Sequence, residues 1–501
     1  MQHFLQLLRK FYVRHAVGVL TALYVICSSF CPNTKIFIIF STMYYLALFL
    51  QTRSFAKTLL FSFFPFFLFN SFGKIYSEEI IPQSNFFYTL QSGYTTSFII
   101  SPFLILLATS VCTLFIFSLQ HRKTHVVSVS LFFFFLFTLL GFLSSERTQY
   151  MPWYSCVSPF MLFATLVWII EMRMYLRERS QSENQELFRH LYDQIALLLS
   201  SQIIIGLLQM VRGGFLGLFI EQSWAGSSSS EAPDSMNILF SFRPSSLSAH
   251  ANLMAYQLID FFGCFVVLHT ILFQNKKSIL PLFFICFFGW IVLIFFSQSR
   301  AAYLALVPFV LGFFVYWRPF IQKFSGSMKR MIPPRIWIEV GCIVFGLCVL
   351  VIVPRVLSSL DAFSAYNGAV FRKQFNEEAL DLIRQNIFLG VGPAMFVPAN
   401  ILLHPTGVNF TFPFDVHNNF LLLAAENGIP AFFCYVAGYL FLLPLVFQKK
   451  KHFLFLFCGI LSLFVMAYFH ALERFFPLTL IVFFLLEMYE TSFDFSNDST
   501  A

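Results

Sequence analysis

Long runs of hydrophobic residues alternate with short polar connections along almost the whole chain. The runs hold about 16–25 residues each, the length that an α-helix needs to cross roughly 30 Å of hydrocarbon. Strands of a membrane barrel would be shorter and would alternate apolar with polar positions. The pattern predicts an all-α polytopic membrane protein with about 12–14 transmembrane helices, near residues 16–31, 36–51, 58–72, 97–119, 126–143, 155–176, 194–211, 249–273, 279–298, 301–317, 336–353, 430–447, 453–469 and 475–490.

Residues 354–429 form the only long hydrophilic segment between apolar runs in the second half of the chain. Counting spans places this segment on the side opposite to the N-terminus. Of the 32 lysines and arginines, 21 fall on the N-terminal side and 11 on the other. Basic residues gather in cytoplasmic connections. We therefore expect a cytoplasmic N-terminus, which we interpret as an uncleaved first anchor, and a single membrane domain over 1–501 with 354–429 as an outer loop.

The overall composition excludes a soluble protein. Hydrophobic residues make up 58% of the sequence and charged residues 11%, with a mean hydropathy of +0.74. Too little polar surface remains to cover a core of this size. The net charge of +8 lies mostly on the N-terminal side of the spans, and no basic stripe is interleaved with aromatic residues. The charge therefore reflects membrane topology, and we expect no nucleic acid partner.

A histidine lies at the start of a predicted short helix within the outer loop. Asp415 is a plausible N-cap, His417 falls in the first turn, and Asn427-Gly428 forms a C-terminal stop before Pro430. The positive end of a helix dipole disfavours imidazolium, so His417 is predicted to stay neutral and able to accept a proton. The alternative is a surface histidine that merely caps a helix.

Two arginines on the outer side are candidates for anion binding. Arg300 lies in a short break between two apolar runs, at the expected outer membrane boundary, where it could instead extend its guanidinium toward lipid phosphates. Arg372 opens a segment, 371–383, with apolar residues at helical spacing, so its alternative is a solvated helix face. Gly390-Val391-Gly392 is too short for a nucleotide-binding motif and is interpreted as a turn.

These pieces, in this order, resemble the O-antigen ligase and polymerase family of membrane glycosyltransferases of the GT-C type. The resemblance rests on Ser299-Arg300-Ala301-Ala302, on Arg372 at the start of a helix that ends in Gly390-Val391-Gly392, and on His417-Asn418 with Gly428. It covers mainly residues 290–450. Nine residues separate Asn418 from Gly428, as in the ligases, whereas Ala431 stands where they carry Gly, Thr or Tyr.

The resemblance implies transfer of a glycan from undecaprenyl diphosphate to an acceptor on the periplasmic face of the bacterial inner membrane, with inversion and without a nucleotide sugar. Arginine forks bind diphosphate oxygens, and a neutral histidine takes a hydroxyl proton. The expected roles are diphosphate binding for Arg300 and Arg372, general base for His417, and support from Asp415, Asn418 and Gly428.

Several alternatives remain open at this point. We favour a ligase that uses a lipid A-core acceptor, with a polymerase of lipid-linked repeat units second and a protein O-glycosylating relative third. A transporter of lipid-linked glycan would usually show two similar halves with binding residues in mid-membrane. We expect no cofactor and no metal, because the outer carboxylates Glu78, Glu79, Glu377, Glu378 and Asp381 show no paired spacing with histidines.

Overall fold

The computed structural model describes residues 2–69, 74–81, 94–120, 129–147, 155–177, 179–218, 221, 244–248, 251–273, 280–297, 299, 301–313, 368–411, 415–441 and 453–469. The elements in chain order are α1 Gln2–Ser29, α2 Thr34–Thr52, α3 Phe55–Leu68, β1 Lys74–Ile81, β2 Tyr94–Ile100, α4 Pro102–Gln120, α5 Val129–Arg147, α7 Val157–Arg177, α8 Gln181–Arg212, α11 Ala251–Phe273, α12 Leu280–Phe296, α15 Gly368–Gln385, α16 Phe396–Leu403, α17 Val408–Thr411, α18 Asn419–Asn427, α19 Ile429–Leu440 and α21 Phe453–Phe469.

The predicted helical span architecture is confirmed. Within the described ranges, four helices are long and apolar enough to cross a membrane, and eight shorter apolar helices of 10–17 residues accompany them, including Ala301–Phe313. The predicted spans near 336–353 and 475–490 lie outside the described residues.

One predicted span begins too early in the sequence. Residues 97–100 belong to β2, which pairs antiparallel with β1 in a two-stranded sheet, and α4 begins only at Pro102. A residue before proline is disfavoured in the helical region, and proline is favoured at the first helical position. The hydroxyl of Ser101 accepts from the Leu104 N–H at 3.2 Å and so caps the helix at this point.

Aromatic side chains fill much of the space between the spans. Phe63 of α3 stacks on Trp168 of α7 with ring centroids 4.2 Å apart, and Phe262 of α11 stacks on Trp290 of α12 at 4.4 Å. Large flat rings supply extensive contact area, and stacked pairs contribute beyond simple burial. A good part of the phenylalanine content is therefore used for packing between helices.

The buried side-chain amide of Gln194 ties the first three helices to α8. The Gln194 amide nitrogen donates to Thr21 Oγ1 at 2.9 Å, to Tyr44 Oη at 3.2 Å and to the Phe61 carbonyl at 2.7 Å. Hydrogen bonds of this kind between membrane helices satisfy polar groups that hydrocarbon cannot. They fix the packing of α1, α2 and α3 around α8.

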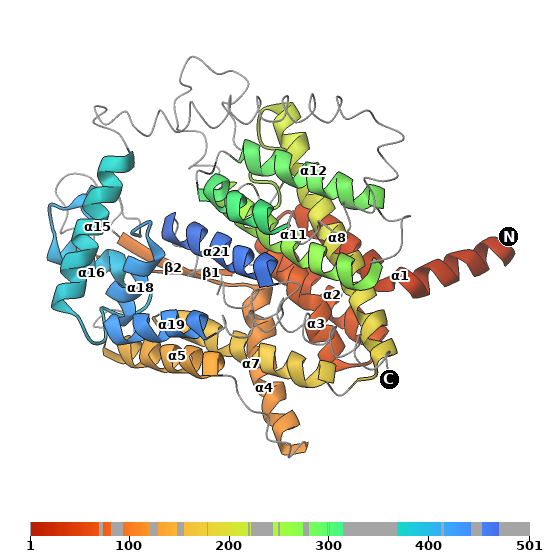
Figure 1. The fold of residues 1–501 in the computed structure, drawn as a ribbon, viewed down its shortest axis with the longest axis horizontal. Helices are drawn as coiled ribbons and strands as arrows, with labels where there is room; N and C mark the ends of the chain where they lie inside the picture. Colours follow the sequence, from red (N-terminus) through yellow and green to blue (C-terminus); the bar gives the residue numbers. More distant parts are fainter. Residues whose placement is uncertain are drawn as a thin grey trace.

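Helices α15, α16, α17 and α18 form a separate unit, which we call the outer unit (residues 368–427). It has its own apolar core, to which Phe375, Leu382, Phe396, Ile401 and Leu422 contribute. Figure 1 shows α15, α16 and α18 at one end of the molecule's longest axis, with the N-terminus of α1 at the opposite end. The outer unit is continuous with α19. It lies on the side of the span bundle away from the N-terminus of α1 (Figure 1).

Candidate functional site

Helix α15 presents Arg372 at the edge of the outer unit's core. Phe375, Leu382 and Ile383 are buried and mark the inner face of this helix, as the apolar spacing predicted. The helix begins at Gly368, so Arg372 lies in its second turn instead of opening it. The Arg372 side chain is half-buried, and this burial lowers its pKa, although a guanidinium stays charged at neutral pH.

The predicted N-cap of the histidine helix is wrong. Asn418 occupies the N-cap position of α18, and its side-chain oxygen accepts from the Phe420 and Leu421 N–H groups at 3.0 and 3.3 Å. Asp415 lies three residues before it, and His417 precedes the helix instead of occupying its first turn. Both Asp and Asn are good caps. Here the extended backbone of Asn418 places its amide over the first free N–H groups.

His417 is held by a backbone carbonyl and packs toward α15. Its Nδ1 lies 3.2 Å from the carbonyl oxygen of Asp415. A carbonyl can only accept, so Nδ1 carries the hydrogen and the lone pair is on Nε2. The His417 ring lies 6.5 Å, centroid to centroid, from Phe375, one turn along α15 from Arg372. The chain thus brings a proton acceptor next to the helix that carries the arginine.

The electrostatic surroundings keep His417 neutral. Burial is the largest cause and lowers the pKa of His417 below its ordinary value of 6.5, and the positive charge of Arg372 lowers it further. The hydrogen bond and the charge of Asp415 act in the opposite direction without reversing the result. The structure therefore brings together two of the predicted site residues, Arg372 and His417.

Two glycines allow the turn after α15 to pack against the C-terminal end of α18. Gly390 (φ 65°) and Gly428 (φ 85°) lie where two backbones touch: a Cβ on Gly390 would lie 2.3 Å from the Glu426 carbonyl, and one on Gly428 would lie 2.3 Å from the Phe388 oxygen. The predicted turn at Gly390-Val391-Gly392 is present. Its Val391 and Gly392 N–H groups donate to the last carbonyls of α18, those of Ala425 and Glu426, at 3.0 and 2.9 Å.

Serines from the first half of the chain complete this junction. Ser144, near the end of α5, donates to the carbonyls of Leu389 and of Glu426, the latter at 2.8 Å. Ser155, just before α7, donates to the Pro393 carbonyl at 2.8 Å. At the other end of α5, Ser130 donates to the Gly438 carbonyl of α19 at 2.6 Å. Helices α5 and α19 therefore run antiparallel and carry the outer unit at one end.

We expect Gly428→Ala to destabilise this junction severely. The new Cβ would lie 2.3, 2.5 and 2.7 Å from backbone atoms of Phe388 and Leu389, in a backbone conformation that costs a residue with a side chain about 1–3 kcal/mol even without a clash. The amount of folded protein after detergent extraction and its melting temperature should both fall. Gly459→Ala is the matched control, since no heavy atom of the described residues lies within 4 Å of its added Cβ. If the two variants give the same amount of folded protein and the same melting temperature, the tight packing around Gly428 is contradicted.

Two carboxylates that sequence reasoning did not assign hold the outer unit together. Glu378 Oε1 accepts from the Val408 N–H at 2.7 Å, and its other oxygen accepts from Asn400. Glu426 is buried and accepts from the Phe396 N–H at 3.2 Å. Neither their spacing nor a motif indicates these contacts. In the described part of the chain, no cluster of three or more His, Cys, Asp or Glu residues has the arrangement of a metal site.

Arg300 lies outside the described residues, so its convergence with Arg372 stays a prediction. Its neighbours are described: Ser299 is buried, and its hydroxyl lies 3.4 Å from the Ala302 N–H, at the start of the helix Ala301–Phe313.

Comparison with known proteins identifies the region that contains these residues. Residues 282–436 match the family model described as O-antigen ligase, which confirms the predicted resemblance. The matched region includes Arg300, Arg372, His417 and the Gly428 junction. A search of curated proteins finds no relative that matches the chain.

Proposed function

Given that residues 282–436 match the O-antigen ligase family, we propose that the chain transfers a glycan from undecaprenyl diphosphate to a sugar hydroxyl of lipid A-core. The observation that carries this proposal is the pairing of Arg372 with a neutral His417 at the edge of the outer unit. Glycosyl transfer from a diphosphate needs a base for the acceptor and cations for the leaving group. His417 supplies the base, and Arg372 supplies one of the cations.

In the proposed reaction, the acceptor oxygen attacks the anomeric carbon from the face opposite to the diphosphate. The new glycosidic bond forms as the bond between the anomeric carbon and the phosphate oxygen breaks, so the configuration inverts. The acceptor's proton passes to Nε2 of His417, and the electron pair of the broken bond leaves with the diphosphate. Arg372, together with Arg300, binds the diphosphate oxygens as their negative charge grows.

Placing Arg372 beside His417 links the two roles. A cation next to the imidazole opposes protonation before substrate is bound, which keeps the base available. Bound diphosphate would offset the arginine's charge and make the histidine more basic when the acceptor is to be deprotonated. The base would thus be strengthened only when the donor is in place.

We expect the pH profile of transfer to reflect this arrangement. Because the pKa of His417 is lowered below 6.5, the free enzyme should keep its base at pH 6.5 and lose it only as the pH falls further. The acid limb of kcat/KM should therefore lie below 6.5. Removing the positive charge of residue 372 should raise the His417 pKa, which NMR titration of the purified Arg372→Gln variant can measure. A titration at or above 6.5 in the unaltered protein would contradict the neutral-base role.

The proposed function also requires a particular membrane and orientation. We infer that the protein lies in the inner membrane with its N-terminus cytoplasmic and the outer unit periplasmic. The distribution of 21 basic residues on one side and 11 on the other supports it. The placement of the outer unit and the N-terminus at opposite ends of the molecule also supports it (Figure 1).

A deletion experiment tests the choice of acceptor. If the protein is a ligase, loss of its gene should leave long undecaprenyl-linked polymer that is not attached to lipid A-core. If lipid A-core instead carries a single repeat unit, the protein is a polymerase and the proposed acceptor is wrong. Electrophoresis of lipid A-core fractions, together with extraction of the lipid-linked pool, distinguishes the two results.

A further inference from the structure

A second polar site lies far from the candidate active site. A pocket of about 270 Å³ opens between the N-terminal part of α8 and the connection between α2 and α3. Val17, Phe61 and Leu187 provide apolar walls, and polar and charged side chains line most of the rest. Its elements lie toward the N-terminal side of the molecule, away from α15 and α18 (Figure 1).

Two of the lining charges are engaged in local structure. Arg179 lies 3.6 Å from Glu183 and 4.4 Å from the centre of the Tyr175 ring. Glu183 also closes a capping box with Ser180 at the start of α8. These two charges are therefore matched to each other before any ligand binds.

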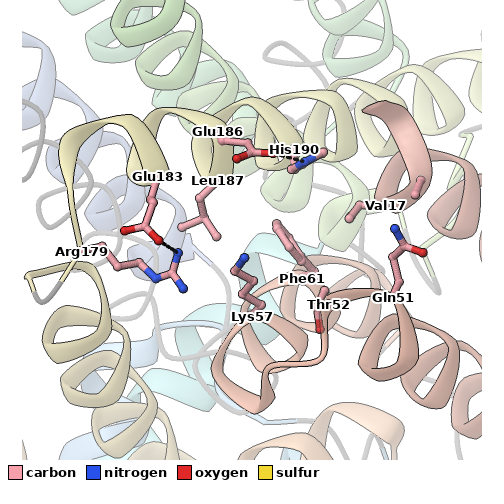
Figure 2. Close-up of a pocket in the computed structure, with 11 residues that line it drawn as sticks. Val17, Gln51, Thr52, Lys57, Phe61, Arg179, Glu183, Glu186, Leu187 and His190 are labelled. Carbon is pink, nitrogen blue, oxygen red and sulfur yellow. Dashed lines mark ion pairs between the residues drawn. The ribbon is translucent and has the colours of Figure 1, made fainter. Parts of the chain in front are cut away.

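Two other charged side chains line the pocket from different helices. Figure 2 shows Lys57 extending from α3 toward α8, where Glu186 and His190 lie. Glu186 is 76% exposed, and its contact with His190 is long, at 4.0 Å. Among the residues that the structure describes, Lys57 forms no ion pair. The pocket therefore holds a cation and an anion with unused capacity.

We propose that this pocket binds the headgroup of a phospholipid that carries both a phosphate and an ammonium, as phosphatidylethanolamine does. The phosphate would contact Lys57, and the ammonium would contact Glu186. A ligand with both charges turns two separated side-chain charges into two close pairs, which a simple anion cannot do. The volume lies just below the range of about 300–1,000 Å³ that is usual for small-molecule sites, so it suits a headgroup.

The placement of the pocket favours a lipid over a free phosphate. Lys57 lies in the first turn of α3 and Glu186 in the second turn of α8, so both lie near the N-terminal ends of apolar helices. Lipid headgroups lie at this level. The acyl chains would then extend along the apolar faces of the helices, beside Leu187 and Phe61.

The test measures lipid binding by the full-length protein purified in detergent. Thermal shift or native mass spectrometry would be recorded with short-chain phosphatidylethanolamine, with short-chain phosphatidylglycerol and with inorganic phosphate. We expect phosphatidylethanolamine to bind best. Lys57→Ala should weaken it at least tenfold, and Lys35→Ala, which removes an equal and exposed charge near the other end of α2, should not.

A second variant tests the contact between Glu186 and the ammonium of the headgroup. Glu186→Gln changes an exposed side chain without altering its size, so it should fold, and it should remove the preference for phosphatidylethanolamine over phosphatidylglycerol. Equal binding of both lipids by the unaltered protein would overturn the ammonium contact. If inorganic phosphate affects the protein as much as the lipids do, the ligand is not a lipid headgroup. If Lys57→Ala and Glu186→Gln both leave lipid binding unchanged, this pocket is not the binding site.

Discussion

Replacing His417 by alanine should reduce glycan transfer by about 10²–10⁴-fold, which is the range that a positioned general base contributes. The imidazole is neutral because burial and Arg372 lower its pKa, and Asp415 fixes its tautomer through a carbonyl. The methyl group of alanine cannot accept a proton, so the acceptor hydroxyl would attack without a base to remove its proton. Transfer by purified protein from a lipid-linked donor is the measurement.

The control for this variant is His404→Ala. His404 ends α16 within the same outer unit and has no role in the proposed chemistry, so its replacement should leave the rate close to that of the unaltered protein. Protein level and melting temperature should be the same in both variants. Full activity of His417→Ala would mean that His417 only packs against Phe375.

Replacing Arg372 by lysine should lower transfer by roughly 10- to 150-fold even though the charge is kept. An ammonium cannot supply the two parallel donors of a guanidinium, and a charged hydrogen bond contributes about 1.5–3 kcal/mol. The loss should appear mainly in kcat, because the diphosphate gains charge as it leaves. Steady-state kinetics with the lipid-linked donor would show it.

The adjacent lysine provides a matched control for Arg372→Lys. Lys373 is 80% exposed and lies 3.8 Å from Glu377, one turn along α15. Lys373→Arg makes the reverse exchange at the next position and should leave transfer unchanged. If both variants behave alike, the proposed contact of Arg372 with the diphosphate is wrong.

The sequence predicted those features that depend on neighbouring residues. The apolar spacing of Phe375 and Leu382 predicted the inner face of α15, and Asn427-Gly428 predicted the end of α18. The N-cap was predicted at Asp415 instead of Asn418, because both residue types cap helices and only the backbone angles distinguish them.

Features that depend on distant residues could not be predicted. Ser144 and Ser155 contact the outer unit across more than 200 positions of sequence, and a serine in an apolar run carries no sign of its partner. The sequence showed Glu378 only as an outer carboxylate without metal-site spacing, yet it accepts a hydrogen bond from the backbone of α17. Such contacts are set by the packing of the spans, which periodicity does not specify.

The contact between Ser144 and Glu426 also determines when the site can form during synthesis. The two residues are 282 positions apart, so at about 5–20 residues per second Ser144 leaves the ribosome roughly 15–55 s before its acceptor. Through that interval α5 has already been made, but the outer unit is incomplete. Helix α15 can be held next to His417 only after α18 and Gly428 have followed. The candidate active centre is therefore among the last parts of the protein to assemble, and a nascent chain interrupted before Gly428 has most of its spans without a reaction site.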